Sequence, residues 1–291
     1  MAFDTSHAKF IEELGNKHEK RIIDALAVLE ARIAELIAGA PLKDGQLFDL
    51  EWAIVARRDI LRAMTEEYLA TANANVNEYK KAADSAFKMI GKYTDFVGLP
   101  AEQIAALQRL SFQGFEDIAS TFLNEIANEV YQNTLTGRTI DKSILTIRQK
   151  INGVYAQSDQ VEIERLVNIA NAGGVEAEEA IKKLHSVYAA DKLGNNMRRY
   201  ATQMVHDSLM QFDAAINVQS GKETGAEFWK YYGSVINDTR EFCAEHAGKV
   251  YTEDEIYKIW EGNWAGKAAG NPFIVRGGWN CRHHWRPYYK D

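Results

Sequence analysis

The sequence is poor in cysteine and proline, and it has no long apolar run. Its 291 residues include only two cysteines, Cys243 and Cys281, and four prolines. Two cysteines are too few for a disulfide scaffold and are typical of a protein from a reducing compartment. No stretch approaches the roughly 18 uncharged apolar residues that a membrane-spanning helix needs. The first 20 residues also lack the apolar core of a secretory signal, so we expect a protein made in a cytoplasm.

Basic residues are also in deficit, because 34 Lys and Arg face 41 Asp and Glu for a net charge of −7. That balance argues against a protein that coats nucleic acid by bulk electrostatics. The low glycine and proline content excludes a collagen-like or low-complexity chain. The 46% of hydrophobic residues are enough for a sizeable core.

Composition changes sharply near residue 220. Residues 221 to 291 hold five of the six tryptophans and both cysteines, with ten basic and ten acidic side chains. The first 220 residues therefore carry the whole net charge. We predict two parts, an elongated helical region over residues 1–220 and a C-terminal module over residues 221–291.

Apolar periodicity predicts that the first part is helical. An early seam repeats at intervals of four and three residues, and Gly39 and Pro41 end it. Its members are Ile22, Leu26, Leu29, Ile33 and Leu36. Such a seam packs either within its own chain or against a second copy. A longer pattern runs over 46–97, which as one unbroken helix would be roughly 75 Å long.

Further helical patterns cover 104–130, 140–151, 159–187 and 197–218. Gly98, Leu99 and Pro100 separate the first of them from the preceding pattern, and Thr139 or Asp141 can cap the second. The histidines of this part have no partners at helical spacing that suggest a metal site: His7, His18, His185 and His206. We expect them to be surface or hydrogen-bonded residues.

The last part is predicted to be a small α+β module. Residues 228–235 have the aromatic and β-branched content of a strand. Asp238 or Thr239 can cap a short helix, and Thr252 with Glu255 forms a capping box for a helix over 254–260. Residues 273–275 and the chain around Trp285 look like short strands. The predicted fold class is thus mainly α, with a long helical N-terminal region before an α+β module.

Two cysteine-histidine pairs in the module are candidate metal ligands. Cys243 and His246 are one helical turn apart, and Cys281 precedes His283, with His284 as the alternative ligand. Two cysteines and two histidines suit a closed tetrahedral zinc site, and zinc would stabilise a module with little core of its own. Two other interpretations are open at this stage. The cysteines could contact each other, reduced or bridged, or they could simply be buried beside hydrogen-bonded histidines.

Two segments of the module resemble one known family. The first is Asp238-x-Arg240-x-x-Cys243-x-x-His246-x-Gly248-Lys249-Val250-Tyr251, and the second is Gly278-Trp279-Asn280-Cys281-Arg282. Together they resemble the tailed-phage Mu F-like head morphogenesis family of minor head proteins. The resemblance covers residues 227–291 and the helical pattern over 201–218. Many members have cysteine where this chain has His246 and His283, an exchange that favours a metal site over a disulfide.

The resemblance implies a virion structural protein, made in the host cytoplasm and present in few copies at the portal or capsid interior. It implies a role in head morphogenesis and in retention or ejection of the genome or internal proteins. The implied partners are portal and capsid proteins. The early helical seam adds self-association through the helices as a further expectation. A C-terminal basic cluster either touches DNA phosphates or pairs locally: Arg276, Arg282, His283, His284, Arg286 and Lys290.

The alternative is an enzyme, either a zinc-dependent nuclease or a delivered effector such as an ADP-ribosyltransferase. A catalytic zinc needs an open coordination position and a nearby general base, for which Glu241 and Glu245 are the close candidates. Four available ligands predict a closed site instead, and the sequence contains no second catalytic arrangement. We therefore expect a protein that is not an enzyme.

Overall fold

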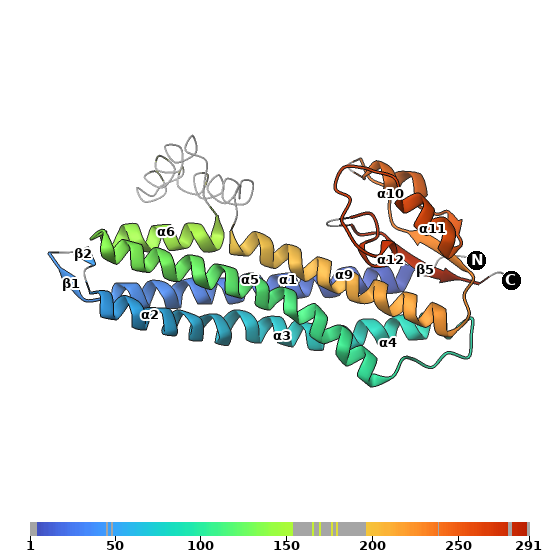
Figure 1. Ribbon diagram of the computed structural model, residues 1–291, viewed down its shortest axis with the longest axis horizontal. Coiled ribbons are helices and arrows are strands. Elements are labelled where there is room, and N and C mark those ends of the chain that lie inside the picture. The colour runs from blue at the N-terminus through green and yellow to red at the C-terminus, as the bar shows by residue number, and fades with distance from the viewer. Residues whose placement is uncertain are drawn as a thin grey trace. The chain divides into compact units, whose positions relative to one another are not determined.

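The computed structural model is mainly helical, with a small strand and helix module at the C-terminal end (Figure 1). It describes residues 5–44, 46–47, 49–153, 165, 169, 176, 179, 196–237, 239–278 and 281–289. The helices are α1 (Thr5–Ala38), α2 (Leu50–Ala63), the π-helix η1 (Met64–Leu69), α3 (Ala70–Asn77), α4 (Tyr79–Ile90), α5 (Ala101–Leu135), α6 (Ile140–Asn152), α9 (Met197–Glu223), α10 (Glu241–His246), α11 (Glu253–Trp260) and α12 (Pro272–Val275). The strands are β1 (Leu42–Lys43), β2 (Gln46–Leu47), β3 (Phe228–Tyr232), β4 (Val250–Tyr251) and β5 (His284–Tyr288). The predicted fold class is confirmed.

Several helices begin or end at the glycine, proline and capping residues that the sequence marks as helix ends. Helix α1 ends at Ala38, just before Gly39 and Pro41, and α5 begins directly after Pro100. The capping box at Thr252 and Glu255 is present at the start of α11. These ends fall where the chain offers a side-chain cap or where proline cannot continue the hydrogen-bond ladder.

One local prediction is wrong. Residues 273–275 form helix α12 rather than a strand, because Pro272 occupies the first helical position and the Asn271 side chain accepts from Phe273 N at 2.9 Å. The pattern over 46–97 does not form one helix. It contains η1, where the ladder widens, and a break at Glu78 between α3 and α4. The helical pattern predicted over 159–187, with His185, lies largely outside the described residues, as does the proposed cap Asp238.

The chain divides into two compact units, which differ from the linear division at residue 220. The first contains Met1–Ile22, Leu69–Asp117 and Gln203–Asp291, and the second contains Ile23–Tyr68 and Ile118–Thr202. The C-terminal module therefore shares a unit with helical segments from three other parts of the chain. Among the described residues, no helix has the length and apolar character needed to cross a lipid bilayer.

In the second unit, the described residues form helices, the β1–β2 hairpin and the segments that connect them. Leu26, Leu29 and Ile33 of the early seam are each at most 1% exposed, so this seam packs within its own chain. Arg32 links α1 to η1 through ion pairs of 2.8 Å to Glu66 and 2.6 Å to Glu67. Of the two alternatives that the sequence left open, packing within the chain and packing against a second copy, the burial of the seam selects the first.

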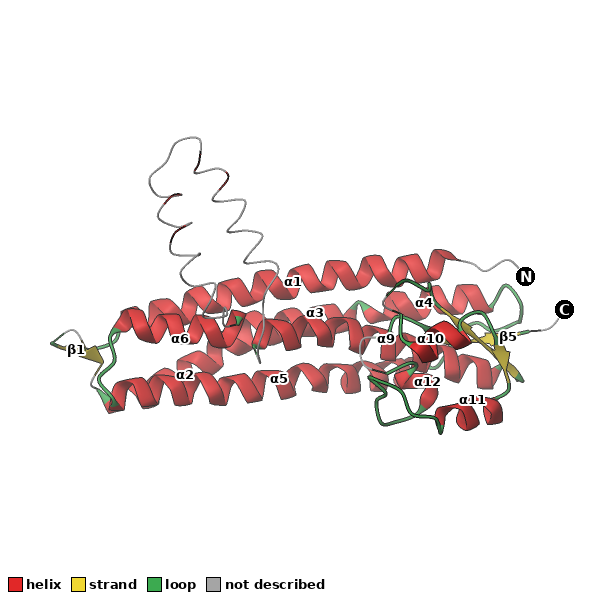
Figure 2. Cartoon of the chain, turned by 90° about the horizontal axis from the view of Figure 1, so that it is seen from above, coloured by secondary structure: helices red, strands yellow, loops and turns green. Residues whose placement is uncertain are grey.

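An antiparallel sheet organises the C-terminal part of the first unit, with strand order β4-β3-β5. Trp229 of β3 lies opposite Tyr251 of β4 and Pro287 of β5, and Tyr231 lies opposite Trp285. Figure 2 shows these strands in yellow beside α10 and α12. The buried core of this part is mostly aromatic: Trp229, Tyr231, Phe242, Cys243, Ile256, Phe273, Cys281 and Trp285.

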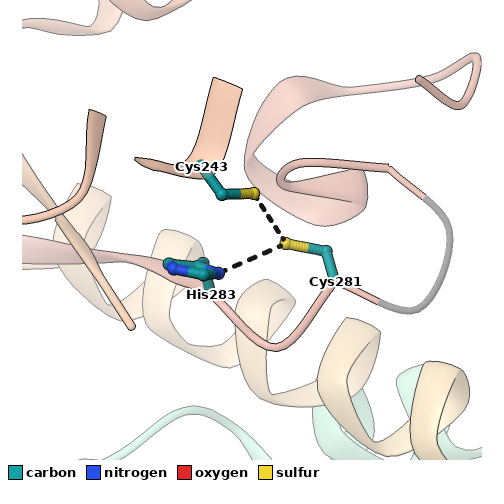
Figure 3. A group of neighbouring side chains, drawn as sticks. All are labelled: Cys243, Cys281 and His283. Atoms are coloured by element: carbon teal, nitrogen blue, oxygen red, sulfur yellow. Dashed lines mark hydrogen bonds between the residues drawn. The ribbon is translucent and has the colours of Figure 1, made fainter. Parts of the chain in front are cut away.

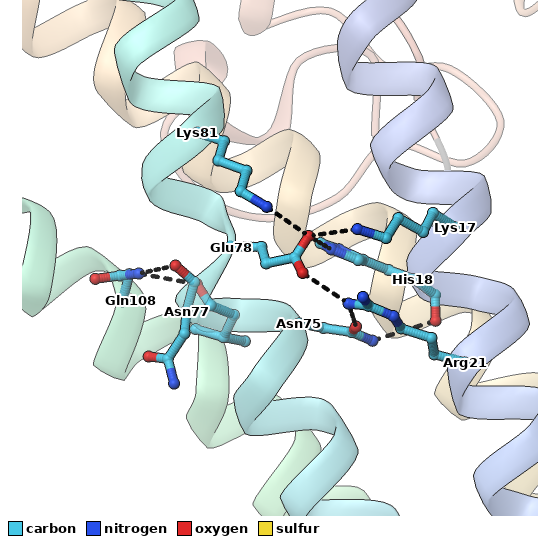
Figure 4. Close-up of polar contacts among 9 residues, drawn as sticks. Lys17, His18, Arg21, Asn75, Asn77, Glu78, Lys81 and Gln108 are labelled. Carbon is cyan, nitrogen blue, oxygen red and sulfur yellow. Dashed lines mark hydrogen bonds and ion pairs between the residues drawn. The ribbon is translucent and has the colours of Figure 1, made fainter.

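In the first unit, the break between α3 and α4 is surrounded by charge (Figure 4). Four side chains pair with the Glu78 carboxylate. Their nitrogen-to-oxygen distances are 2.9 Å for Lys17, 2.9 Å for Arg21, 3.3 Å for Lys81 and 3.4 Å for His18. Burial alone would raise the pKa of Glu78, but these hydrogen bonds outweigh it and hold that pKa well below its usual range. Gln108 of α5 donates to the backbone carbonyl of Val76 at 2.9 Å, beside the break.

His18 makes the stability of this unit depend on pH. Burial lowers the pKa of His18 from 6.5 to about 4. Because the unfolded chain binds this proton between pH 6.5 and 4 and the folded chain does not, stability falls as the pH falls through that window. His18→Gln lacks this titrating group. Lowering the pH from 7 to 4.5 should therefore reduce the unfolding free energy of the parent by on the order of 2 kcal/mol more than that of the variant. Urea unfolding at both pH values measures it, and a difference that stays constant would contradict the assignment.

Candidate metal centre

Three of the predicted ligands come together in one buried group (Figure 3). Cys243 lies on α10, whereas Cys281 and His283 lie on the segment that leads into β5. The two sulfurs are 3.6 Å apart, and Cys281 Sγ is 3.9 Å from His283 Nδ1. One ligand atom from each residue lies within 4.8 Å of the others. The group therefore joins two segments that are 38 residues apart in sequence.

These distances fit a single coordinated ion. Two sulfurs bound at 2.3 Å to one tetrahedral ion lie roughly 3.8 Å apart, close to the observed separation. A disulfide requires about 2.05 Å, and both cysteines are free. The group can thus hold a metal ion, and two thiols with one imidazole are donors that soft and borderline transition metals prefer.

Glycines make room for the group. A Cβ at Gly277 would overlap Cys243 Sγ and come within 2.9 Å of Cys281 Sγ and 3.0 Å of the Tyr231 hydroxyl. A Cβ at Gly233 would overlap the His283 ring. Both glycines therefore permit the close approach of backbone to ligands that a compact metal site needs.

The hydroxyl of Tyr231 closes the space beside the two sulfurs. It lies 3.4 Å from Cys243 Sγ and 3.5 Å from Cys281 Sγ, and its ring stacks on His283 at a centroid distance of 5.3 Å. Burial raises the pKa of Tyr231 well above its usual value, so the phenol stays protonated. A protonated phenol donates to a thiolate, which supports a negative charge on the sulfurs.

The pKa values of the two thiols are shifted in opposite directions. The hydrogen bond with Cys243 lowers the pKa of Cys281 well below the ordinary thiol value, and His283 and the charge of Arg276 act in the same direction. The same hydrogen bond raises the pKa of Cys243. These contacts favour one thiolate within the pair, and thiolate is the form that binds metals.

His246 and His284 lie outside the group. The ring of His246 pairs through Nδ1 with the Tyr251 hydroxyl at 2.7 Å and packs on Phe242, so it does not join the three ligands although it is on the same helix as Cys243. His284 is the next residue after a ligand on an extended segment, and it points elsewhere, with Nε2 3.3 Å from Arg286. The structure thus selects His283 rather than His284, and assembles three of the four predicted ligands.

Most side chains of the C-terminal basic cluster are buried. Arg276 is 1% exposed and donates to the carbonyls of Ile274 and Cys281 at 2.7 and 3.1 Å. Arg286 is 2% exposed, with one guanidinium nitrogen 3.3 Å from Met89 Sδ. Arg282 is exposed, and Lys290 lies outside the described residues. Local pairing is what the structure assigns to the two buried arginines.

His7 is a hydrogen-bonded histidine, as expected, and it belongs to a second buried polar group whose partners no sequence pattern indicates. His7 of α1 pairs through Nε2 with Asp213 of α9 at 2.7 Å and through Nδ1 with Ser85 of α4 at 2.8 Å. The side chains of His7 and Asp213 are 2% and 0% exposed. The two residues are 206 positions apart, so no local spacing signals the pair.

Comparisons with protein-family models, with curated proteins and with solved structures give no match for this chain.

Proposed function

We propose that this chain is a structural protein of a tailed-phage head, of the minor head protein type, whose C-terminal module is held together by a zinc ion. Its place would be the portal vertex or the capsid interior, and its role head morphogenesis, with retention or ejection of the genome or internal proteins. The observation that carries the proposal is the meeting of the two signature segments. Cys243 from the first and Cys281 from the second lie 3.6 Å apart in one buried group.

The identity of the ion follows from the donor set. Cysteine thiolates and imidazole at these separations suit zinc in a tetrahedral structural site. The three ligands are Cys243, Cys281 and His283, which are 2%, 3% and 6% exposed. A buried ion of this kind stabilises the connection between α10 and the segment before β5, and it leaves the helices to make the contacts with portal and capsid proteins.

One observation favours the enzyme alternative. Three protein ligands with a fourth position left over are the pattern of a catalytic zinc. The burial of all three ligands and the Tyr231 hydroxyl beside both sulfurs speak against it, because substrate and water need access to a catalytic ion. A zinc-dependent nuclease activity of the purified chain that is lost in the Glu245→Gln variant would decide for this alternative.

The test of the proposal is the composition of phage particles. Particles produced by the phage whose genome encodes this chain should contain it in a few copies, measured by quantitative mass spectrometry against the major capsid protein. It should also co-purify with the portal protein when the two are expressed together. Absence from purified particles, together with no association with the portal, would contradict the proposal.

A further inference from the structure

The three ligands of the candidate metal centre leave one coordination position to be filled. Structural zinc sites are almost always four-coordinate and take all four ligands from the protein. The rings of His246 and His284 do not supply the fourth, because His246 Nδ1 and His284 Nε2 pair with other side chains at 2.7 and 3.3 Å. The two glutamates of α10, Glu241 and Glu245, are exposed.

The hydroxyl of Tyr231 lies where a fourth ligand would lie. An oxygen bound at about 2.0 Å and a sulfur bound at about 2.3 Å to one tetrahedral ion are roughly 3.5 Å apart. The hydroxyl oxygen is 3.4 Å from Cys243 Sγ and 3.5 Å from Cys281 Sγ. Both observed distances therefore match a tetrahedron around a shared ion.

The surroundings of Tyr231 hold its oxygen in this position. The residue lies on β3 and is 0% exposed. Its ring stacks on His283 and packs on Trp285, with centroid distances of 5.3 and 4.4 Å. In the part of the chain that the structure describes, the hydrogen bonds of this hydroxyl go to the two sulfurs. The oxygen thus faces the ligand atoms, and no other described side chain competes for it.

We infer that the Tyr231 oxygen is the fourth ligand of the zinc ion, in a closed site of two sulfurs, one nitrogen and one oxygen. The inference rests on the proposed zinc centre. In the ion-free site the phenol keeps its proton. When its oxygen binds the ion, the O–H bond breaks, an oxygen–zinc bond forms and the proton leaves to solvent, because a divalent cation is the largest local charge in such a site.

Nearby arginines supply charge for three anionic ligands. Two thiolates and one phenolate around a divalent ion leave one negative charge in excess. Arg276 is 1% exposed and donates to the Cys281 carbonyl at 3.1 Å. The charge of Arg276 acts on Cys281, and that of Arg240 acts on Cys243. The buried centre can therefore carry a phenolate ligand, which also keeps water off the ion.

A phenol that only donates a hydrogen bond to a thiolate beside the ion is the alternative role for Tyr231. Both roles place the oxygen at similar distances from the sulfurs. They differ in the proton, because only a ligand loses it when zinc binds. Ultraviolet difference spectroscopy detects ionised tyrosine, so it separates the two roles directly.

The experiment titrates the metal-free full chain with zinc at pH 7 and records ultraviolet difference spectra. Zinc binding should ionise one tyrosine for each ion bound. Tyr231→Phe should lose this signal and bind zinc more than about a hundredfold more weakly, beyond the roughly 10–100-fold cost of losing a contact to a ligand. The matched control is Tyr251→Phe, whose hydroxyl pairs with His246 instead, and it should keep both the signal and the affinity. Circular dichroism shows whether each variant keeps its helix content.

The parent spectrum separates a failure of this inference from a failure of the zinc centre. Zinc bound by the parent without ionisation of a tyrosine would overturn the inference and leave the metal centre intact. An ionisation signal that persists in Tyr231→Phe would also overturn it. A parent chain that binds no zinc would contradict the metal centre itself, and the inference with it.

Discussion

Replacing Cys281 by serine is expected to remove the bound metal ion and to unfold the sheet of strands β3, β4 and β5. Serine supplies no thiolate, and in the proposed centre an ion held by Cys243, Cys281 and His283 would link α10 to the segment before β5. Structural zinc contributes on the order of 10 kcal/mol to the folding of small modules, more than most domains have in total. The metal content is measured by mass spectrometry of the purified chain. Hydrogen exchange then reports which segments lose protection, and α2 and α6 should keep theirs.

Histidine variants provide the controls for this prediction. His283→Gln should lower metal affinity strongly, whereas His206→Gln, at a half-exposed histidine on α9, should leave it unchanged. His246→Gln distinguishes the three ligands of the structure from the four predicted from the sequence. It should retain the ion, because the His246 ring contacts Tyr251 and Phe242 instead. A Cys281→Ser chain with full metal content and an intact sheet would contradict the metal centre.

Replacing Asp213 by asparagine is expected to destabilise the first unit by about 3–5 kcal/mol, the usual cost of breaking a buried ion pair from one side. Its carboxylate faces His7 at 2.7 Å, and the charges of His284 and Arg286 also act on it. Burial alone would raise the pKa of Asp213, but the charge and the hydrogen bond of His7 outweigh it and hold that pKa well below its usual range. The carboxylate is therefore ionised, and its loss removes a counter-charge of the buried Arg286 guanidinium.

Glu19 offers a matched control for Asp213. It pairs with His206 at 2.8 Å, but the two side chains are 30% and 36% exposed. Glu19→Gln should therefore cost at most about 1 kcal/mol, as is typical of exposed pairs. Urea unfolding at pH 7 measures both variants. Equal small losses for Asp213→Asn and Glu19→Gln would show that the His7 pair adds nothing to stability. Because a lowered carboxyl pKa stabilises only above the unfolded value of about 4, the difference should shrink as the pH falls below 4.

Sequence patterns predicted the elements whose causes are local. Apolar periodicity, Pro100, and the pair Thr252 and Glu255 act within a few residues, and they set the helical part and the boundaries of α5 and α11. The Phe273 segment was assigned to the wrong element, because apolar and β-branched content alone does not distinguish a short strand from one helical turn that starts at a proline. Two of the cations that pair with Glu78 at the break, Lys17 and Arg21, come from α1, which no window around residue 78 contains.

The candidate site was also predicted only in part, because some of its residues are positioned by contacts that are distant in the sequence. Cys243, Cys281 and His283 stand out by residue type and spacing, and the structure brings them together. The position of His246 depends on Tyr251 and Phe242, which decide the direction of its ring. The roles of Gly277 and Tyr231 depend on how the segments pack in three dimensions, and their spacing in the sequence carries no metal signal.

The most direct test of the central claim, that one ion joins the two signature segments, is X-ray absorption at the zinc edge of the purified full chain. We predict one zinc per chain with two sulfur ligands near 2.3 Å and at least one nitrogen ligand near 2.0 Å. The same spectrum from Cys243→Ser should lose sulfur from its ligand shell or show no bound zinc. A parent chain that binds no metal, or whose ion has no sulfur neighbours, would contradict the account.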